Sequence, residues 1–112
     1  MLKYRKSKVV EPKQGCPLSA CLSFLKGSWT PNVIWYLREQ PRRFNELKGD
    51  LTPISSKILS QRLKRLTETG LLKRRTVATS PPSVEYALTD LGRKVLPALE
   101  ALVEVGNALN RR

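Results

Sequence analysis

The clearest periodic pattern in the chain is a stripe of leucines near its middle. Leu59, Leu63 and Leu66 recur at helical spacing and fall on one narrow face at about 100° per residue. One of the serines at 55–56 can cap the start of such a helix, and Gly70 provides a natural stop. The positions opposite the stripe are Lys57, Gln61, Lys64 and Glu68. The pattern predicts a helix that docks through leucines and turns a mostly cationic face outward.

Proline, glycine and capping residues divide the rest of the chain into further elements. We expect a first helix through residues 18–25 that Gly27 stops, and then a buried helix from Thr30 to Gln40. An extended link at 42–44 follows, and after it a brief helix capped by Asn45. Later in the chain we expect strands at 71–77 and 84–88 around a loop, and a long final helix capped by Thr89. Pro97 removes one hydrogen bond from the final helix and should bend it near Arg93.

This order describes a winged helix-turn-helix, because two short helices are followed by a basic helix and a basic hairpin. The predicted fold class is mainly α with a small β-hairpin. A length of 112 residues suits one domain, since domains usually hold roughly 100–150 residues. We place that domain at residues 15–110 and expect residues 1–14 to be a flexible basic arm.

The distribution of charge along the chain indicates which kind of molecule it binds. The chain carries 21 lysines and arginines against 9 acids, a formal net charge of +12. Residues 42–75 hold ten basic and three acidic residues, residues 1–14 have a net charge of +4, and residues 77–112 have none. A cationic centre favours a polyanion, and double-stranded DNA is the expected one. A membrane-surface or protein-interaction module is disfavoured, because the charge lies on a leucine-docked helix without an exposed aromatic face.

The same composition argues against several other classes. The chain has no histidine, no paired-carboxylate motif and no Gly-rich phosphate loop, so we expect neither an enzyme nor a bound cofactor. Cys16 and Cys21 are too few for a zinc cluster or a disulfide framework. No apolar run approaches the roughly 20 residues that span a bilayer. A soluble cytoplasmic protein without a metal is the expectation.

The cationic helix and its surroundings supply candidate contacts to DNA. A helix fits the major groove of B-DNA, which is about 12 Å wide, and can read base edges there. Gln61 can make two hydrogen bonds to adenine, while flanking lysines can contact guanine or phosphate. The candidate DNA-contacting residues are Arg42, Arg43, Ser55, Ser56, Lys57, Ser60, Gln61, Lys64, Arg65, Lys73, Arg74 and Arg75.

Two alternatives remain open at this point. A charged helix face is often merely solvated, although here only Glu68 interrupts the cations and the same charge recurs in the hairpin and the link. A winged helix can also act as a non-specific architectural or RNA-binding protein without an effector. Competition with random DNA separates these cases, because specific binding typically exceeds non-specific binding by about 10³–10⁷.

Several motifs stand in a fixed order along the chain. They are Cys16-Pro17, Gly27-Ser28-Trp29-Thr30, Pro41-Arg42-Arg43-Phe44-Asn45-Glu46-Leu47, the run from Ile54 to Leu63, Gly70-Leu71-Leu72 and the run from Val84 to Gly92. Over about residues 16–106 the chain resembles the HxlR-type winged-helix transcriptional regulators, relatives of the MarR group. It departs from the family in two places. The family often has a second glycine and a lysine before its tryptophan, where this chain has Lys26-Gly27-Ser28-Trp29, and it often has a tryptophan before the late glycine, where this chain has Val105-Gly106.

The resemblance implies a prokaryotic regulator that binds palindromic DNA as a homodimer, with the serine-led helix in the major groove and the hairpin as the wing. The final helix carries an apolar stripe that is buried either in its own domain or against a partner helix, and the resemblance favours the partner. Dimerisation would then use the N- and C-terminal helices. The expected interface residues are Leu18, Leu22, Leu25, Leu99, Leu102, Val103, Gly106 and Leu109.

The resemblance also singles out Cys16. Some HxlR-type regulators respond to oxidants or small reactive electrophiles through the cysteine at this position. Cys16 precedes a helix N-terminus and follows the basic arm, and both features favour the thiolate. The alternative is an inert small residue packed beneath the helix. For Cys21, which shares the apolar side of its helix, we expect core packing.

Overall fold

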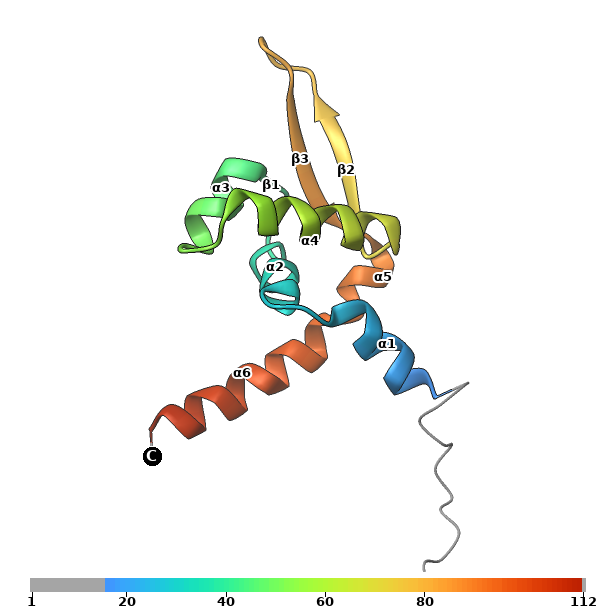
Figure 1. The fold of residues 1–112 in the computed structure, drawn as a ribbon, viewed down its shortest axis with the longest axis vertical. Helices are drawn as coiled ribbons and strands as arrows, with labels where there is room; N and C mark the ends of the chain where they lie inside the picture. The colour runs from blue at the N-terminus through green and yellow to red at the C-terminus, as the bar shows by residue number, and fades with distance from the viewer. Residues whose placement is uncertain (1–15, 112) are drawn as a thin grey trace, which may run out of the picture.

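The structure, a computed structural model, describes residues 16–111, so the predicted basic arm of residues 1–14 lies outside the described part. Its elements are α1 (Pro17–Leu25), α2 (Thr30–Tyr36), β1 (Arg42–Arg43), α3 (Phe44–Asp50), α4 (Ser56–Glu68), β2 (Leu72–Val77), β3 (Ser83–Leu88), α5 (Asp90–Arg93) and α6 (Leu96–Asn110). The β2–β3 hairpin projects from one end of the molecule, while α1 and α6 extend from the other (Figure 1). The mainly α winged helix-turn-helix is confirmed.

Helix α4 forms as the leucine stripe predicts. Ser55 is its N-cap, because the Ser55 Oγ accepts a hydrogen bond from the backbone N–H of Ile58 at 3.1 Å. At the other end, the N–H of Leu71 donates to the carbonyl of Leu66 at 3.0 Å, a pattern common where a helix ends at a glycine. The N-cap at Ser55 and the glycine at position 70 therefore end α4 where the sequence predicts.

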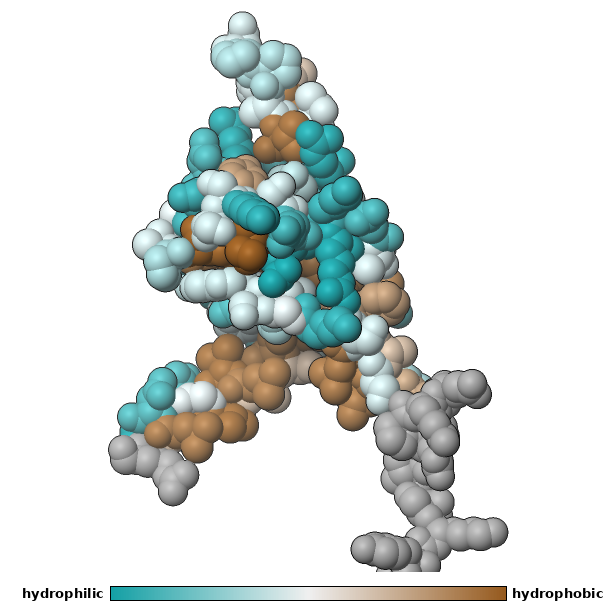
Figure 2. Space-filling view, viewed as in Figure 1, coloured by the Kyte–Doolittle hydropathy of each residue, from teal (hydrophilic) through white to brown (hydrophobic). Residues whose placement is uncertain are grey.

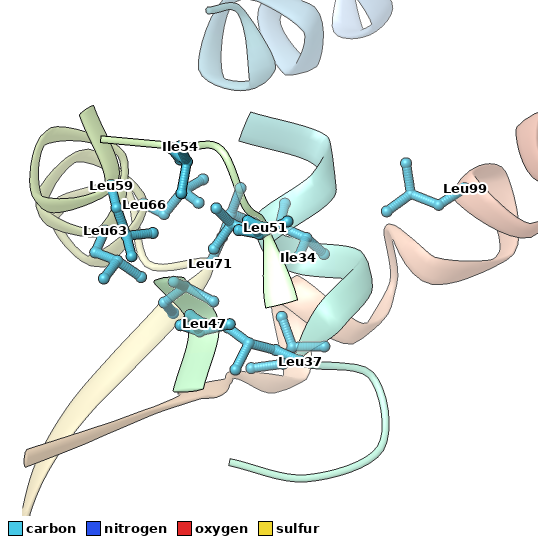
Figure 3. Close-up of a cluster of buried hydrophobic side chains, with 13 residues drawn as sticks. Ile34, Leu37, Leu47, Leu51, Ile54, Leu59, Leu63, Leu66, Leu71 and Leu99 are labelled. Atoms are coloured by element: carbon cyan, nitrogen blue, oxygen red, sulfur yellow. The ribbon is translucent and has the colours of Figure 1, made fainter. Parts of the chain in front are cut away.

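The leucine stripe forms the centre of the core. Leu59, Leu63 and Leu66 expose at most 1% of their surface. They pack in one hydrophobic cluster with apolar side chains of α2 and α3, among them Ile34 and Leu47 (Figure 3). Burying one such side chain is worth about 1.5–3 kcal/mol relative to leaving it exposed. This packing determines which face of α4 points to solvent.

The sheet has three strands rather than the two of the predicted hairpin. Its order is β1-β3-β2, and both pairings are antiparallel. The expected link at Arg42 and Arg43 pairs with Tyr86 and Glu85 of β3. The link becomes an edge strand because its backbone groups find partners along the otherwise free edge of β3.

Two helices begin at residues other than the predicted caps. The N-cap of α2 is Trp29, whose backbone is left-handed at φ 76°, and Thr30 is instead a buried first residue of the helix. The N-cap of α3 is Arg43 rather than Asn45. The reason is that the carboxylate of Glu46 accepts a hydrogen bond from the backbone N–H of Arg43 at 2.9 Å.

Helix α2 also ends at Tyr36, before the predicted end at Gln40. The guanidinium of Arg38 donates to the carbonyl of Trp35 at 2.8 Å and lies over its ring at 4.1 Å. The backbone N–H groups of Leu37 and Arg38 donate to the carbonyls of Ile34 and Trp35 at 3.1 and 3.2 Å, so the helix tightens into i→i−3 bonds and ends short of Pro41.

The long final helix is two helices. Thr89 caps the first of them, α5, and its Oγ1 accepts from the N–H of Gly92 at 3.0 Å. In a continuous helix, residue 97 would donate to the carbonyl of Arg93, and Pro97 has no N–H to do so. Pro97 instead lies in the first turn of α6, where no helical bond is lost. Between the two helices the backbone of Lys94 and Val95 stays in the right-handed helical region. Their N–H groups donate to the carbonyls of Leu91 and Gly92 at 3.1 Å, so the predicted bend is a tightened two-residue turn.

Candidate nucleic-acid interface

Helix α4 presents an open polar face opposite the buried leucines. Lys57, Ser60, Gln61 and Lys64 are all exposed. Hydrophilic side chains gather over this helix and the base of the hairpin (Figure 2). Among residues 16–111, neither lysine of this face forms an ion pair. The face thus offers hydrogen-bonding groups and uncompensated positive charge together.

A groove lies between α4 and the sheet. Strand register places Arg74 directly opposite Tyr86, so both side chains belong to one face of the sheet. The groove has a volume of about 220 Å³ and is lined by Ser60, Lys64, Thr67, Glu68, Arg74 and Tyr86. Tyr86 was not among the candidates from sequence, because its place beside Arg74 follows from strand pairing and not from a local pattern.

Two candidate arginines are held by carboxylates. Arg42 Nη2 lies 2.7 Å from Asp50 Oδ2, and Arg75 Nη2 lies 2.7 Å from Glu85 Oε1. A guanidinium in such a pair offers little net charge to a phosphate. Among the candidate contacts, the exposed cations without such a partner in the described part of the chain are Arg43, Lys57, Lys64, Lys73 and Arg74.

Arg65 belongs to a different contact. Its Nη2 donates to the carbonyl of Ser23 in α1. The neighbouring Arg62 donates from Nε to the carbonyl of Ser28 at 2.8 Å. Both bonds join the flank of α4 to α1 and the loop that follows it. The structure therefore assigns Arg65 to this intramolecular contact rather than to the open face predicted for DNA.

The helices α1 and α6 carry large apolar side chains that the rest of residues 16–111 leaves uncovered. Leu18 exposes 66% and Leu102 exposes 63% of its surface. Hydrophobic residues cover both helices at the end away from the hairpin (Figure 2). An apolar groove of about 760 Å³ lies between α1 and α6. Of the expected interface residues, the exposed ones are Leu18, Leu22, Leu102, Val103 and Leu109, and the half-buried ones are Leu25 and Gly106.

Leu99 differs from the other expected interface residues. It is only 6% exposed and belongs to the hydrophobic cluster of its own chain. Helix α6 therefore turns one side toward the core through Leu99 and leaves its other sides open. Phe24 and Leu91, which were not among the expected interface residues, are exposed and also line the α1–α6 groove.

Both cysteines are free thiols on or beside α1. Cys16 is half-buried at the N-cap position. Hydrogen bonding from Ser19, through its hydroxyl and then its backbone N–H, lowers the pKa of the Cys16 thiol below its ordinary value. Cys21 is exposed and lines the α1–α6 groove, so the expected core packing is not found. The reason is that no element of the described part of the chain covers that side of α1.

Two other kinds of site are absent from residues 16–111. No three cysteine, aspartate or glutamate side chains come together there as metal ligands. No helix in that range combines the length and apolar character needed to cross a membrane. The candidate functional surfaces of the described residues are therefore the polar face of α4 and the apolar faces of α1 and α6.

Known proteins share this arrangement. Residues 24–112 match the model of the HxlR-like helix-turn-helix family. The chain belongs to this family. An uncharacterized HTH-type transcriptional regulator of Halalkalibacterium halodurans, BH0655, is 45% identical to this HxlR-like protein over 94 residues, which make up 83% of each chain.

Solved structures extend the match to three dimensions. A protein described as a MarR-family transcriptional regulator from Porphyromonas gingivalis has a TM-score of 0.80 and 35% identity, over 91% of this chain and 96% of its own. The redox regulator HypR in its oxidized form has a TM-score of 0.78 and 29% identity, over 83% of this chain and 96% of its own. This HxlR-like protein is a transcriptional regulator of the helix-turn-helix type.

Proposed function

We propose that this HxlR-like protein regulates transcription by binding a palindromic DNA operator as a homodimer, with α4 in the major groove. The proposal rests on the two faces of α4. Its leucine stripe is buried, while Lys57, Gln61 and Lys64 on the opposite face are open to solvent. A helix anchored in this way can enter a groove about 12 Å wide without any rearrangement of the core.

In this arrangement Gln61 reads bases and the surrounding groups hold the backbone. The Gln61 amide can accept from N6 of adenine and donate to N7. The N-terminus of α4 at Ser55 and Ser56 offers hydroxyls and backbone N–H groups to a phosphate. The proposed DNA-contacting residues are Arg43, Ser55, Ser56, Lys57, Ser60, Gln61, Lys64, Lys73 and Arg74.

The apolar faces of α1 and α6 are the proposed dimer contact. A two-fold dimer would cover the exposed leucines of both copies at once, which accounts for apolar surface that residues 16–111 of a single copy leave in water. Two copies of α4 would then address half-sites roughly 34–36 Å apart, one turn of DNA. The proposed interface residues are Leu18, Leu22, Leu25, Leu102, Val103, Gly106 and Leu109.

We further propose that oxidation or electrophilic modification of Cys16 alters DNA binding. The structurally similar HypR is a redox regulator with oxidized and reduced forms. In this chain Ser19 lowers the pKa of Cys16, and a lower pKa raises the fraction of reactive thiolate. The hydrogen bonds of Arg62 and Arg65 connect α1 to α4, so a displacement at the start of α1 has a route to the reading helix.

Footprinting across the DNA that flanks the gene tests the proposal, followed by titration of the full chain on the protected duplex and on a scrambled duplex of equal length. We expect a palindromic footprint, a dimer in solution, and binding to the scrambled duplex weaker by at least about 10³. Binding should fall after treatment with diamide or an aldehyde and return with reductant. Equal affinity for both duplexes, or preference for RNA, would favour the non-specific architectural or RNA-binding alternative.

A further inference from the structure

The groove between α4 and the sheet collects polar groups from two separate elements. Its α4 wall carries Ser60, Lys64 and Glu68, and its sheet wall carries the paired Arg74 and Tyr86. Within residues 16–111, none of these five side chains forms an ion pair or a side-chain hydrogen bond. They are therefore available to a ligand.

The position of the groove indicates what that ligand is, and this step rests on the proposed function. If α4 lies in the major groove, the β2–β3 hairpin that projects beside it reaches toward the neighbouring minor groove (Figure 1). One sugar–phosphate strand separates a major groove from the next minor groove. That strand must therefore pass between α4 and the sheet.

We propose that this groove binds one phosphodiester of that strand. Lys64 and Arg74 supply the positive charge from opposite walls. Tyr86 donates a hydrogen bond from its hydroxyl, and Ser60 can donate another. Contacts of this kind hold a protein in register on the duplex without reading sequence.

The arginine on the other side of Tyr86 does not share this role. Strand register places Arg42 of β1 and Arg74 of β2 on opposite flanks of Tyr86, on one face of the sheet. The guanidinium of Arg42 is held by Asp50 at 2.7 Å. Arg74 has no such partner among the described residues, so it alone of the two can turn to a phosphate.

Glu68 opposes the anion in the same groove. It is exposed, lies one turn beyond Lys64 and forms no ion pair with a described residue. Its carboxylate repels a bound phosphodiester, whatever the base sequence. In a chain with a net charge of +12, this repulsion lowers affinity for the operator and for random DNA by the same factor, so it moderates overall affinity and leaves sequence preference unchanged.

Titrations on an operator duplex and a scrambled duplex, at salt concentrations from roughly 50 to 200 mM, test the proposal. Glu68→Gln should tighten binding to both duplexes about threefold to tenfold and leave their ratio unchanged. Glu100→Gln makes the same charge change on exposed α6 and should have less than half of that effect. Thermal unfolding of each variant reports whether the fold is intact.

The cationic wall has its own variants. Arg74→Gln should weaken binding to both duplexes about tenfold and lower the salt slope by about one for each protomer, while Arg74→Lys keeps the slope. Tyr86→Phe should weaken both about threefold with an unchanged slope, because the phenol carries no charge.

Two results would overturn the proposal while leaving the regulator function intact: a Glu68→Gln affinity equal to that of the parent chain, or an Arg74→Gln loss confined to the operator. Failure of the parent chain to bind any duplex would instead reject the proposed function and this groove together.

Discussion

Gly27 lies directly against the guanidinium of Arg62. A Cβ at residue 27 would come 3.1 Å from the Cζ of Arg62, and the Gly27 backbone has a φ of +104°. The same guanidinium donates to the carbonyl of Ser28 at 2.8 Å, and Arg65 donates to the carbonyl of Ser23. The loop after α1 and the flank of α4 are thus fitted to each other.

This fit predicts that Gly27→Ala destabilises the fold by about 2 kcal/mol, because a side chain is strained at positive φ and also crowds Arg62. Gly49→Ala is the matched control, since a Cβ at Gly49 in α3 meets no atom within 4 Å. Alanine there should be neutral or stabilise by up to about 1 kcal/mol. Urea unfolding measures both, and equal stability of the two variants would contradict the fit.

Gln61→Ala should weaken binding to the operator by about 1–3 kcal/mol and leave binding to a scrambled duplex nearly unchanged, because only base contacts carry sequence information. Lys73→Ala should weaken both duplexes and flatten the salt slope by about one per protomer. Fluorescence anisotropy on both duplexes measures the difference. An equal loss on every sequence for Gln61→Ala would show that this side chain does not read bases.

Leu102→Asp should shift the proposed dimer toward monomer, because a carboxylate replaces an apolar group that the proposed interface would bury. Leu99→Ala, three residues away and inside the core, should instead lower the free energy of unfolding by about 2–5 kcal/mol. Sedimentation equilibrium and urea unfolding separate the two effects. A Leu102→Asp chain that stays dimeric at micromolar concentration would place the interface elsewhere.

Alkylation of Cys16 should follow a pH profile with its midpoint below that of a free cysteine, about 8.5, because Ser19 favours the thiolate and so lowers the pKa. Reactivity therefore persists at lower pH and is lost as pH falls through the lowered pKa. Iodoacetamide kinetics in a Cys21→Ser background measure the profile. Ser19→Ala keeps the backbone N–H but removes the hydroxyl, so it should move the midpoint upward, and an unmoved midpoint would remove the Ser19 hydroxyl as the main cause.

The parts of the fold that could be predicted from sequence depend on local patterns. Helical spacing alone identifies the buried face of α4, since Leu59, Leu63 and Leu66 repeat every three or four residues. The caps Ser55 and Thr89 are likewise local, because each hydroxyl accepts from an N–H three residues later.

The parts that could not be predicted depend on contacts between distant segments. Arg65 looked like a member of the cationic face, but its acceptor at Ser23 lies 42 residues earlier in the chain. Strand β1 is only two residues long, and its pairing with Tyr86 becomes visible only once β3 is in place. The sheet side of the groove opposite Lys64 follows from the β2–β3 register that pairs Arg74 with Tyr86, so sequence identified its lysine and arginine but not its tyrosine.

The two-residue turn before Pro97 has an evolutionary consequence. It leaves Lys94 and Val95 as a corner between the winged helix-turn-helix body and helix α6. In a dimer joined through α6, the angle at this corner sets the distance between the two copies of α4. That distance sets the spacing between the two half-sites of the operator, although Lys94 and Val95 themselves touch no base. A descendant can therefore acquire a new spacing by substitutions at the corner while it keeps its recognition sequence.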